Sequence, residues 1–389
     1  MLPIYGIYLM AVAALARKAL GLTGRPAVRK IVLFDPSVGP DRLHSIVEAC
    51  GGRLKKALPL INGAACVFPG EEQAISLLAR AGEVKWVEDD FMVSIVKERF
   101  VRPRPKPRQQ SMPWGVKRIL APGCWDRTTG KGVRVAVLDT GIDMNHPDLK
   151  SNVRGGYDTI NERPDPTDDN GHGTHVAGTI AALNNGFGVV GVAPEASIYA
   201  VKAFDSRGQG QVSDIVQGVE WCVQQKVNII NMSFGTRESS KALTLAMEKA
   251  AAAGIIMVAA AGNEGRQDSV LYPGRDPNVM AVAATTPDDR IASFSSSGRE
   301  VAISAPGEDV PSTYKGSTYK TTSGTSMACP HVSGVAALIL SAVPTLTRDE
   351  VRKAICGTAI RLSGFSAEQQ GAGLVSAQAA LRAALQLAR

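Results

Sequence analysis

Apolar residues follow two different periods along most of this 389-residue chain. Short continuous runs rich in Val, Ile and Ala predict buried strands at 133–138, 198–201, 227–232, 255–260 and 279–283. Between them, apolar residues recur every three or four positions, which predicts helices at 174–183, 213–225 and 241–253. Strands without a polar face need cover on both sides, and helices between successive strands supply it. The pattern predicts an α/β domain with a parallel sheet in three layers.

A smaller unit precedes this domain. Its pattern predicts strand, helix, strand, strand, helix and strand at 30–34, 41–50, 54–60, 64–68, 71–81 and 84–87. Two glycines at 51–52 mark the turn after the first helix. The order βαββαβ is the split βαβ, or ferredoxin-like, arrangement.

The N-terminus carries an almost unbroken apolar run at 2–15, followed by Arg17 and Lys18. The run is short for a membrane span and fits the apolar core of a secretory signal, although no basic residue precedes it. A buried or disordered N-terminus is the alternative. We expect an exported protein with no stable membrane span, divided into a leader (1–27), the small unit (28–96), a basic proline-rich linker and processing region (97–110) and the main domain (111–389).

The linker alternates proline with basic residues at 101–108. Because proline lacks the N–H that a sheet requires, this stretch is predicted to be extended, solvated and outside any sheet. It is either a plain spacer or the place where the chain is cut. Both readings leave it accessible to proteases.

The net charge of +7 comes from the leader and the linker. Residues 111–389 hold 26 basic and 26 acidic side chains, so the main domain is neutral and a nucleic-acid partner is not expected.

The six cysteines include no CxxC pair and are too sparse for a secreted disulfide framework. We expect most of them to be buried thiols, and they do not settle the compartment.

Three short segments carry candidate chemistry. Asp139 closes the apolar run at 133–138, His172 follows Asp-Asn-Gly just before the helix predicted at 174–183, and Ser326 lies in Gly-Thr-Ser-Met-Ala. A serine nucleophile needs a base to take its proton and an acid to hold that base in the right tautomer. Strand ends and helix starts are where an open α/β sheet places its active site. We therefore predict that these three side chains converge.

These segments, in this order, resemble the catalytic blocks of the subtilisin family of serine proteases. The resemblance runs from about residue 28 to the C-terminus and includes an N-terminal inhibitor-type propeptide. It implies a subtilisin-like catalytic domain that acts on polypeptide substrates with broad apolar specificity. It also implies a secreted, monomeric endopeptidase that is made as a zymogen, with its own propeptide as intramolecular inhibitor. It also implies that the Asn263 side chain and the Ser326 main-chain N–H stabilise the oxyanion.

The same resemblance assigns substrate contacts. Two segments would sandwich an extended peptide, and further residues would line the fourth pocket before the cut and the P1 pocket, where P1 is the residue before the cleaved bond. The two peptide-binding segments are Gly208, Gln209 and Gly210, and Ser233, Phe234 and Gly235. Val212 and Ile215 would line the fourth pocket, and Gly262 and Leu271 the P1 pocket. Leu271 stands where a small residue often forms the floor of the P1 pocket, so we predict a shallow apolar pocket that disfavours Arg and Lys.

A structural calcium site is also implied. Hard cations need several oxygen ligands, and here one carboxylate, two amides and three loop carbonyls would supply them. The residues are Asp148, Gln110, Asn185, Leu183, Phe187 and Val189.

Several alternatives are left open by the sequence. A binding protein could keep this fold without catalysis, the small unit could serve mainly as an inhibitor of other proteases, and the linker composition could indicate a processing protease specific for basic residues.

Asp143 and Asp169 either support the site electrostatically or cap turns. His175 and His331 are expected to be structural rather than metal ligands, and Met327 and Cys329 to be packing residues beside the nucleophile.

Overall fold

The computed structural model describes residues 27–387 except 70–75, 77, 97–98 and 105–108. The chain forms two compact units, and the division between them falls between Asp90 and Phe91. The leader, except Ala27, and most of the helix expected at 71–81 lie outside the described residues.

The small unit is an antiparallel four-stranded sheet with helix α2 (Pro40–Ala49). Its strands are β1 (Val28–Phe34), β2 (Arg53–Leu58), β3 (Gly63–Phe68) and β4 (Val84–Asp89), in the order β2-β3-β1-β4. That order is the one expected for a split βαβ arrangement. Val32, Phe34 and Phe68 form its core with Ile46 and Val47 of α2.

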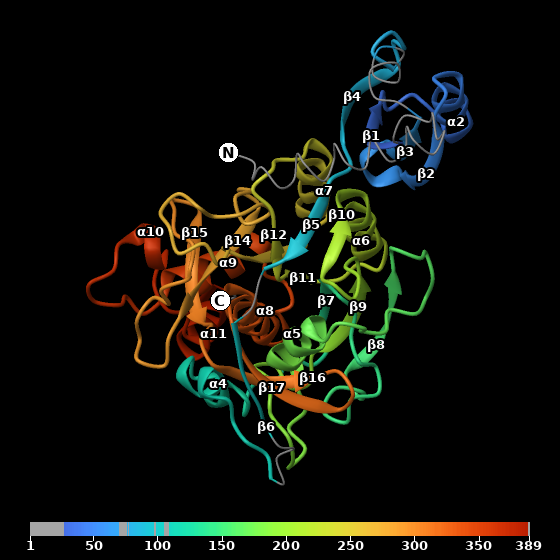
Figure 1. Cartoon of the computed structure of the whole chain (residues 1–389). Helices are drawn as coiled ribbons and strands as arrows, with labels where there is room; N and C mark the ends of the chain where they lie inside the picture. Colours follow the sequence, from blue (N-terminus) through green and yellow to red (C-terminus); the bar gives the residue numbers. More distant parts are fainter. Residues whose placement is uncertain (1–26, 70–75, 77, 97–98, 105–108, 388–389) are drawn as a thin grey trace, which may run out of the picture. The chain divides into compact units, whose positions relative to one another are not determined.

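The large unit is built on a seven-stranded parallel sheet in the order β15-β14-β13-β11-β7-β9-β8 (Figure 1). Its strands are β7 (Arg134–Asp139), β8 (Val153–Asp158), β9 (Ser197–Lys202), β11 (Ile229–Met232), β13 (Ile256–Ala260), β14 (Val279–Thr285) and β15 (Val301–Pro306). The five strands predicted from apolar runs are confirmed. The edge strands β8 and β15 were not predicted.

Helices cover both faces of this sheet, as predicted. Alternate residues of β7 show this: Val135 and Val137 join the cluster formed with α5 (His172–Ala181) and α8 (Thr325–Ala342). Leu138 points to the other face, where it lies against Gly218 of α6 (Val212–Gln224). A further helix, α7 (Lys241–Ala252), packs against α6.

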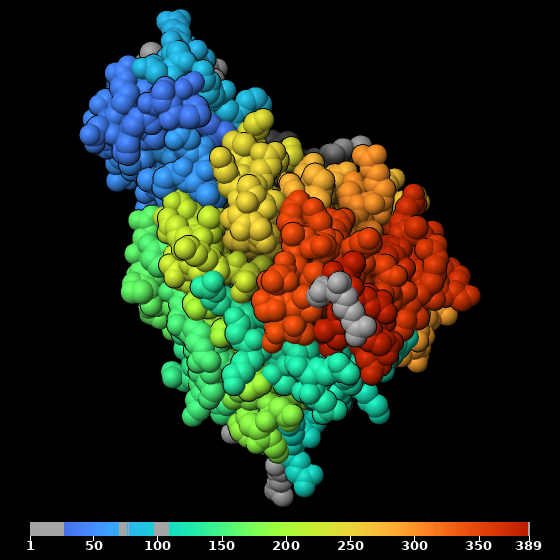
Figure 2. Space-filling model, turned by 180° about the vertical axis from the view of Figure 1, so that it is seen from behind, coloured from blue at the N-terminus to red at the C-terminus, as the bar shows by residue number. Residues whose placement is uncertain are grey.

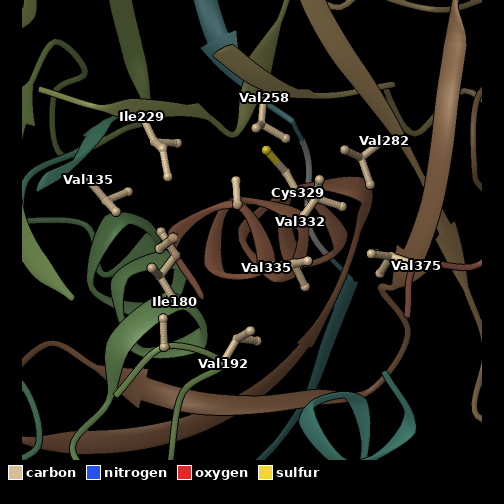
Figure 3. Close-up of a cluster of buried hydrophobic side chains, with 14 of the residues drawn as sticks. Val135, Ile180, Val192, Ile229, Val258, Val282, Cys329, Val332, Val335 and Val375 are labelled. Atoms are coloured by element: carbon tan, nitrogen blue, oxygen red, sulfur yellow. The ribbon is translucent and has the colours of Figure 1, made fainter. Parts of the chain in front are cut away.

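Helix α8 is the centre of the main core. Val135, Ile229 and Val258 of three neighbouring strands surround it together with Ile180 and Val192 (Figure 3). It is long and apolar enough to cross a membrane, but 83% of its 18-residue window is buried inside the fold. Its composition is therefore explained by its position in the core.

The proline-rich linker corrects one expectation. Residues 99–104 form strand β6 (Arg99–Arg104), which pairs antiparallel with β17 (Thr318–Ser323) of the hairpin β16 (Val310–Tyr314)–β17. The register shifts between Tyr319 and Thr321, opposite the part of β6 that contains its proline. An edge strand donates hydrogen bonds through alternate residues only, so a proline at an edge or bulge is tolerated.

The C-terminal helices are α9 (Arg348–Gly357), α10 (Ala367–Gln370) and α11 (Ala377–Leu387). Thr347 and Glu350 form the capping box at the start of α9. Helix α11 packs against the 3-10 turn at Ala121–Cys124, and Figure 2 shows these C-terminal residues (red) beside that segment (teal).

All six cysteines are free thiols. Four are buried, and Cys50 and Cys356 are partly buried. The expectation of buried thiols is confirmed for the majority.

Candidate active site

The carboxyl ends of three adjacent parallel strands bring the candidate residues to one edge of the sheet. Asp139 is the last residue of β7, Ser233 follows β11, and Gly262 and Asn263 follow β13 shortly after its end. Parallel strands end on the same side, so these residues, far apart in sequence, share one edge.

Asp139 and His172 form a buried pair. The Nδ1 of His172, the first residue of α5, lies 2.7 Å from Oδ1 of Asp139, and both side chains are almost fully buried. The same Oδ1 accepts the main-chain N–H of Thr140 at 2.7 Å. A carboxylate only accepts, so the imidazole carries its proton on Nδ1, and Nε2 is left as the atom that can take up a proton.

Ser326 is the second residue of α8, which places it at the positive end of that helix. Its hydroxyl is buried and donates to the main-chain oxygen of Ser233 at 2.9 Å. Proton transfer to His172 therefore requires this hydroxyl proton to be redirected from the Ser233 oxygen to the imidazole.

The Asn263 amide is held in one orientation. Its Oδ1 accepts both the main-chain N–H and the hydroxyl of Thr325, each at 2.9 Å. Its Nδ2 consequently faces the other way, and a Cβ added to Gly324 would lie 3.0 Å from it. The amide donor thus lies beside the segment that leads into Ser326, where an oxyanion donor is needed.

A strand of the chain itself occupies the expected peptide groove. Strand β5 (Met92–Ile95) pairs antiparallel with β10 (Gln209–Gln211) and with β12 (Phe234–Gly235), so it lies between them (Figure 1). Ile95 donates its N–H to the oxygen of Gly208 at 2.9 Å. Strand β5 thus lies between the two segments expected to sandwich a peptide, and Val93 of β5 and the following Val96 are only 1% and 6% exposed.

Leu271 lies between the two glycine segments that bound the expected P1 pocket. A Cβ added to Gly235 would lie 2.7 Å from Leu271, and one added to Gly262 would lie 2.8 Å from it. Leu271 belongs to the same apolar cluster as Val96. Val212 and Ile215, expected at the fourth pocket, are fully buried at the start of α6, which directly follows β10.

Comparison with known proteins identifies the family. The profile of the Subtilase family matches residues 130–378. The chain belongs to the subtilase family. It is an α/β serine endopeptidase of the subtilisin type, as the sequence resemblance implied.

The subtilase is similar to several characterised members. It is 44% identical to subtilisin E of Bacillus subtilis over 340 residues, which cover 86% of this chain and 84% of that one. It is 49% identical to subtilisin Savinase of Lederbergia lenta over 274 residues, 70% of this chain and 100% of Savinase. The structure of fervidolysin from Fervidobacterium pennivorans, described as a keratinolytic enzyme related to subtilisin, superposes with a TM-score of 0.82 at 29% identity. That match covers 92% of this subtilase but only 61% of fervidolysin.

The subtilase brings the expected cation ligands together in one loop region. The Asn185 amide donates to Asp148 at 3.0 Å, and the Gln110 amide donates to the carbonyls of Leu183 and Val189 at 2.7 and 3.3 Å. Two amide N–H₂ groups thus face oxygen atoms that are expected to be cation ligands. A half-turn of the Gln110 amide would exchange its nitrogen for its oxygen, which is the atom that could bind a cation.

The backbone of that loop is shaped around the carboxylate. Gly188 has a φ of +65°, and a Cβ there would lie 1.9 Å from Asp148 Oδ2, so only glycine fits. Phe187 lies in the same turn and donates its N–H to Asn185 at 3.2 Å. Among the described residues no three His, Cys, Asp or Glu side chains could hold a metal, so a cation here would depend on carbonyl and amide oxygens beside one carboxylate.

Sequence reasoning missed Asp168, the residue that connects the end of β7 with the start of α5. It accepts the Thr140 hydroxyl at 2.9 Å, the Gly171 N–H at 2.8 Å and the Thr174 hydroxyl at 2.6 Å. Burial raises the pKa of Asp168, although the hydrogen bonds from Thr174 and Gly171 oppose the rise. The sequence pointed to the neighbouring Asp169, which instead pairs with Lys202 at 2.6 Å.

The two further histidines of the motifs are buried and hold the main chain. His175 contacts the Val310 oxygen at 3.1 Å, and burial lowers its pKa to about 3. His331 contacts the Met327 oxygen at 2.8 Å, and burial lowers its pKa to about 4. Both are therefore neutral at pH 7, which fits the structural role expected for them.

Proposed function

We propose that this subtilase is a secreted endopeptidase made as a zymogen, with Asp139, His172 and Ser326 as its triad and Asn263 in its oxyanion hole. The observation that carries the proposal is the buried Asp139–His172 pair at the sheet edge where α8 begins with Thr325 and Ser326, beside the two segments that hold strand β5 between them. A binding protein without catalysis would need the groove but not the pair.

The proposed chemistry follows from the donors and acceptors present. Ser326 Oγ attacks the peptide carbonyl carbon while His172 Nε2 takes its proton, and Asp139 stabilises the imidazolium that forms. The oxyanion accepts hydrogen bonds from Asn263 Nδ2 and the Ser326 N–H. The C–N bond then breaks as His172 returns the proton to the leaving amine, and water, activated by His172, hydrolyses the acyl-enzyme.

The strand β5 supports the zymogen proposal. It lies between β10 and β12 as a product-like strand, and the side chains of Val93 on β5 and of Val96 directly after it are buried. If the chain is cut after Val96, these two are the fourth residue before the cut and the P1 residue. The unit at 28–96 then acts as the intramolecular inhibitor, and the leader at 1–27 directs export.

A covalent serine-directed probe tests the proposed function. After release of the small unit, a fluorophosphonate should label the protein once, on the peptide that contains Ser326. Labelling of another serine, or no labelling of a protein shown to be folded, would contradict the proposal.

The P1 preference is expected to depend on Leu271. Leu271→Gly removes the side chain between Gly235 and Gly262 and so enlarges the pocket. It should raise the ratio of kcat/KM for P1 Phe over P1 Ala by at least about tenfold, because the volume of an apolar pocket determines which of these two side chains fits better. Leu271→Met, which conserves volume, is the matched control. A panel of chromogenic peptides measures the ratio. An unchanged preference in Leu271→Gly would show that Leu271 does not line the P1 pocket.

The carboxylate that follows Asn263 does not support the basic-specific alternative. Glu264, next to Asn263, is bonded to both Arg237 and Arg266. Partial burial would raise its pKa, but the hydrogen bonds from Arg266 and Arg237 outweigh burial and lower it. Its charge is therefore already neutralised, and the same peptide panel should show no preference for P1 Arg or Lys.

We also propose that Ca²⁺ binds at Asp148. The Asp148 carboxylate, the amide oxygens of Gln110 and Asn185 and the carbonyls of Leu183, Phe187 and Val189 would hold it. The bound ion would join the segment at 110 to the loop after α5 and so stabilise the fold.

A further inference from the structure

A proline in the nucleophile helix leaves one main-chain oxygen without its helical partner. Pro330 lies four residues after Ser326 inside α8. Since proline has no N–H, the Ser326 carbonyl cannot receive the usual hydrogen bond of an α-helix. A buried carbonyl in that position needs another donor.

The side chain of Ser233 supplies that donor. Its hydroxyl donates to the Ser326 main-chain oxygen at 3.0 Å, while the Ser326 hydroxyl donates to the Ser233 main-chain oxygen at 2.9 Å. The two residues, both fully buried, therefore hold each other reciprocally. The contact fixes the backbone of the residue that also offers its own N–H to the oxyanion.

The Ser233 hydroxyl is itself oriented by Asn231. The amide N–H of Asn231 donates to Ser233 Oγ at 2.9 Å. A hydroxyl has one proton, and because its oxygen accepts from Asn231, that proton is directed to Ser326. Asn231 is fully buried on β11, the strand between β7 and β13.

Two groups of α8 fix the orientation of the Asn231 amide. Its oxygen accepts the Cys329 thiol at 3.2 Å and the Ser333 hydroxyl at 2.9 Å. Two donors on one side prevent the amide from turning over, because its N–H₂ would then face them. Burial raises the pKa of the Cys329 thiol to about 12, so it keeps the proton that it donates. Cys329, expected to be a packing residue, thus has a directed polar contact.

We infer that Asn231 and Ser233 are positioning residues, which hold the main chain of Ser326 against the carboxyl edge of the sheet, with Cys329 and Ser333 locking the Asn231 amide. The inference rests on the proposed function, since it assigns these residues to the nucleophile. They act on the rate of the chemical step through the placement of Ser326, and not on substrate affinity, because the main-chain oxygen of Ser233 is left in place when its hydroxyl is removed.

The test compares Ser233→Ala, Cys329→Ala and Cys329→Ser in the mature enzyme, with Ser304→Ala as the matched control. Ser304 is also a fully buried serine, on β15, and its hydroxyl has no hydrogen-bond partner among the described residues. Each variant is assayed for kcat and KM with one chromogenic peptide, for the fraction of Ser326 labelled by a fluorophosphonate at saturation, and for its melting midpoint.

Ser233→Ala should lower kcat about tenfold with KM within about twofold, the size expected when one hydrogen bond to a buried carbonyl is lost. Cys329→Ala should lower kcat by less than Ser233→Ala does. Cys329→Ser, which keeps a hydrogen-bond donor, should restore kcat to the wild-type value. Ser304→Ala should keep the wild-type kcat. Complete labelling of Ser326 in every variant shows that the proposed function holds independently of this inference.

The inference is overturned if Ser233→Ala keeps the wild-type kcat, if its loss appears in KM alone, or if Ser304→Ala loses as much. It is also overturned if Cys329→Ser falls to the level of Cys329→Ala. Absence of labelling in the wild-type enzyme would instead count against the proposed function.

Discussion

Ser326→Ala is expected to yield a folded, uncut chain without peptidase activity. Removing the hydroxyl removes the only group of the proposed triad that can form the acyl-enzyme, so kcat should fall by about 10⁶-fold, the size of loss known for subtilisin without its nucleophile. The small unit should stay covalently attached, because the same serine is proposed to make the first cut. Gel mobility, intact mass and a chromogenic peptide measure these outcomes.

The control for this variant is Ser341→Ala. Ser341 lies on the same helix, and its hydroxyl donates to the Lys131 oxygen, away from the sheet edge. This control should mature and hydrolyse peptides as the wild type does. Release of the small unit from purified Ser326→Ala, in the absence of any other protease, would refute self-processing, and retained hydrolysis would refute the assignment of Ser326.

Removal of calcium should produce the largest change in stability. With free Ca²⁺ at about a thousand times its dissociation constant, binding contributes about 4 kcal/mol to the free energy of unfolding. For a domain of this size, chelation should then lower the melting midpoint by about 10 °C. The measurement is best made on Ser326→Ala, because an active protease digests its own unfolded chains during the scan.

Asp148→Asn in the Ser326→Ala background isolates the site. It keeps the shape of the buried side chain but removes the one carboxylate among the proposed ligands. Its midpoint should match that of the chelated parent and should not respond to Ca²⁺ or to chelator. A parent protein whose midpoint is the same with and without chelator would rule out a structural calcium.

The sequence predicted those parts of the fold in which burial is continuous. Strands β7, β13 and β14 are apolar on both faces, so their runs stand out from the helical periods around them. By contrast, β8 contains Arg154, Gly155 and Gly156 and lies at a sheet edge. Its polar composition gives no strand pattern, because an edge strand is not covered on both sides.

Contacts set by the tertiary structure could not be predicted in the same way. Asp139, His172 and Ser326 stand in motifs, but the partner of the Ser326 carbonyl depends on Pro330 in one helix and on Ser233 at the end of a distant strand. The pairing of β6 was missed because a rule about proline in central strands was applied to a strand that joins an edge.

The six thiols of this chain have a consequence for its behaviour toward air and reductants. Burial raises the pKa of every one of the six cysteines, including the partly buried Cys50 and Cys356. Oxidants and disulfide exchange act on the thiolate, which these side chains hardly form near neutral pH. We therefore expect this enzyme to stay free of cross-links in air, and to lose no disulfide when a reductant is added.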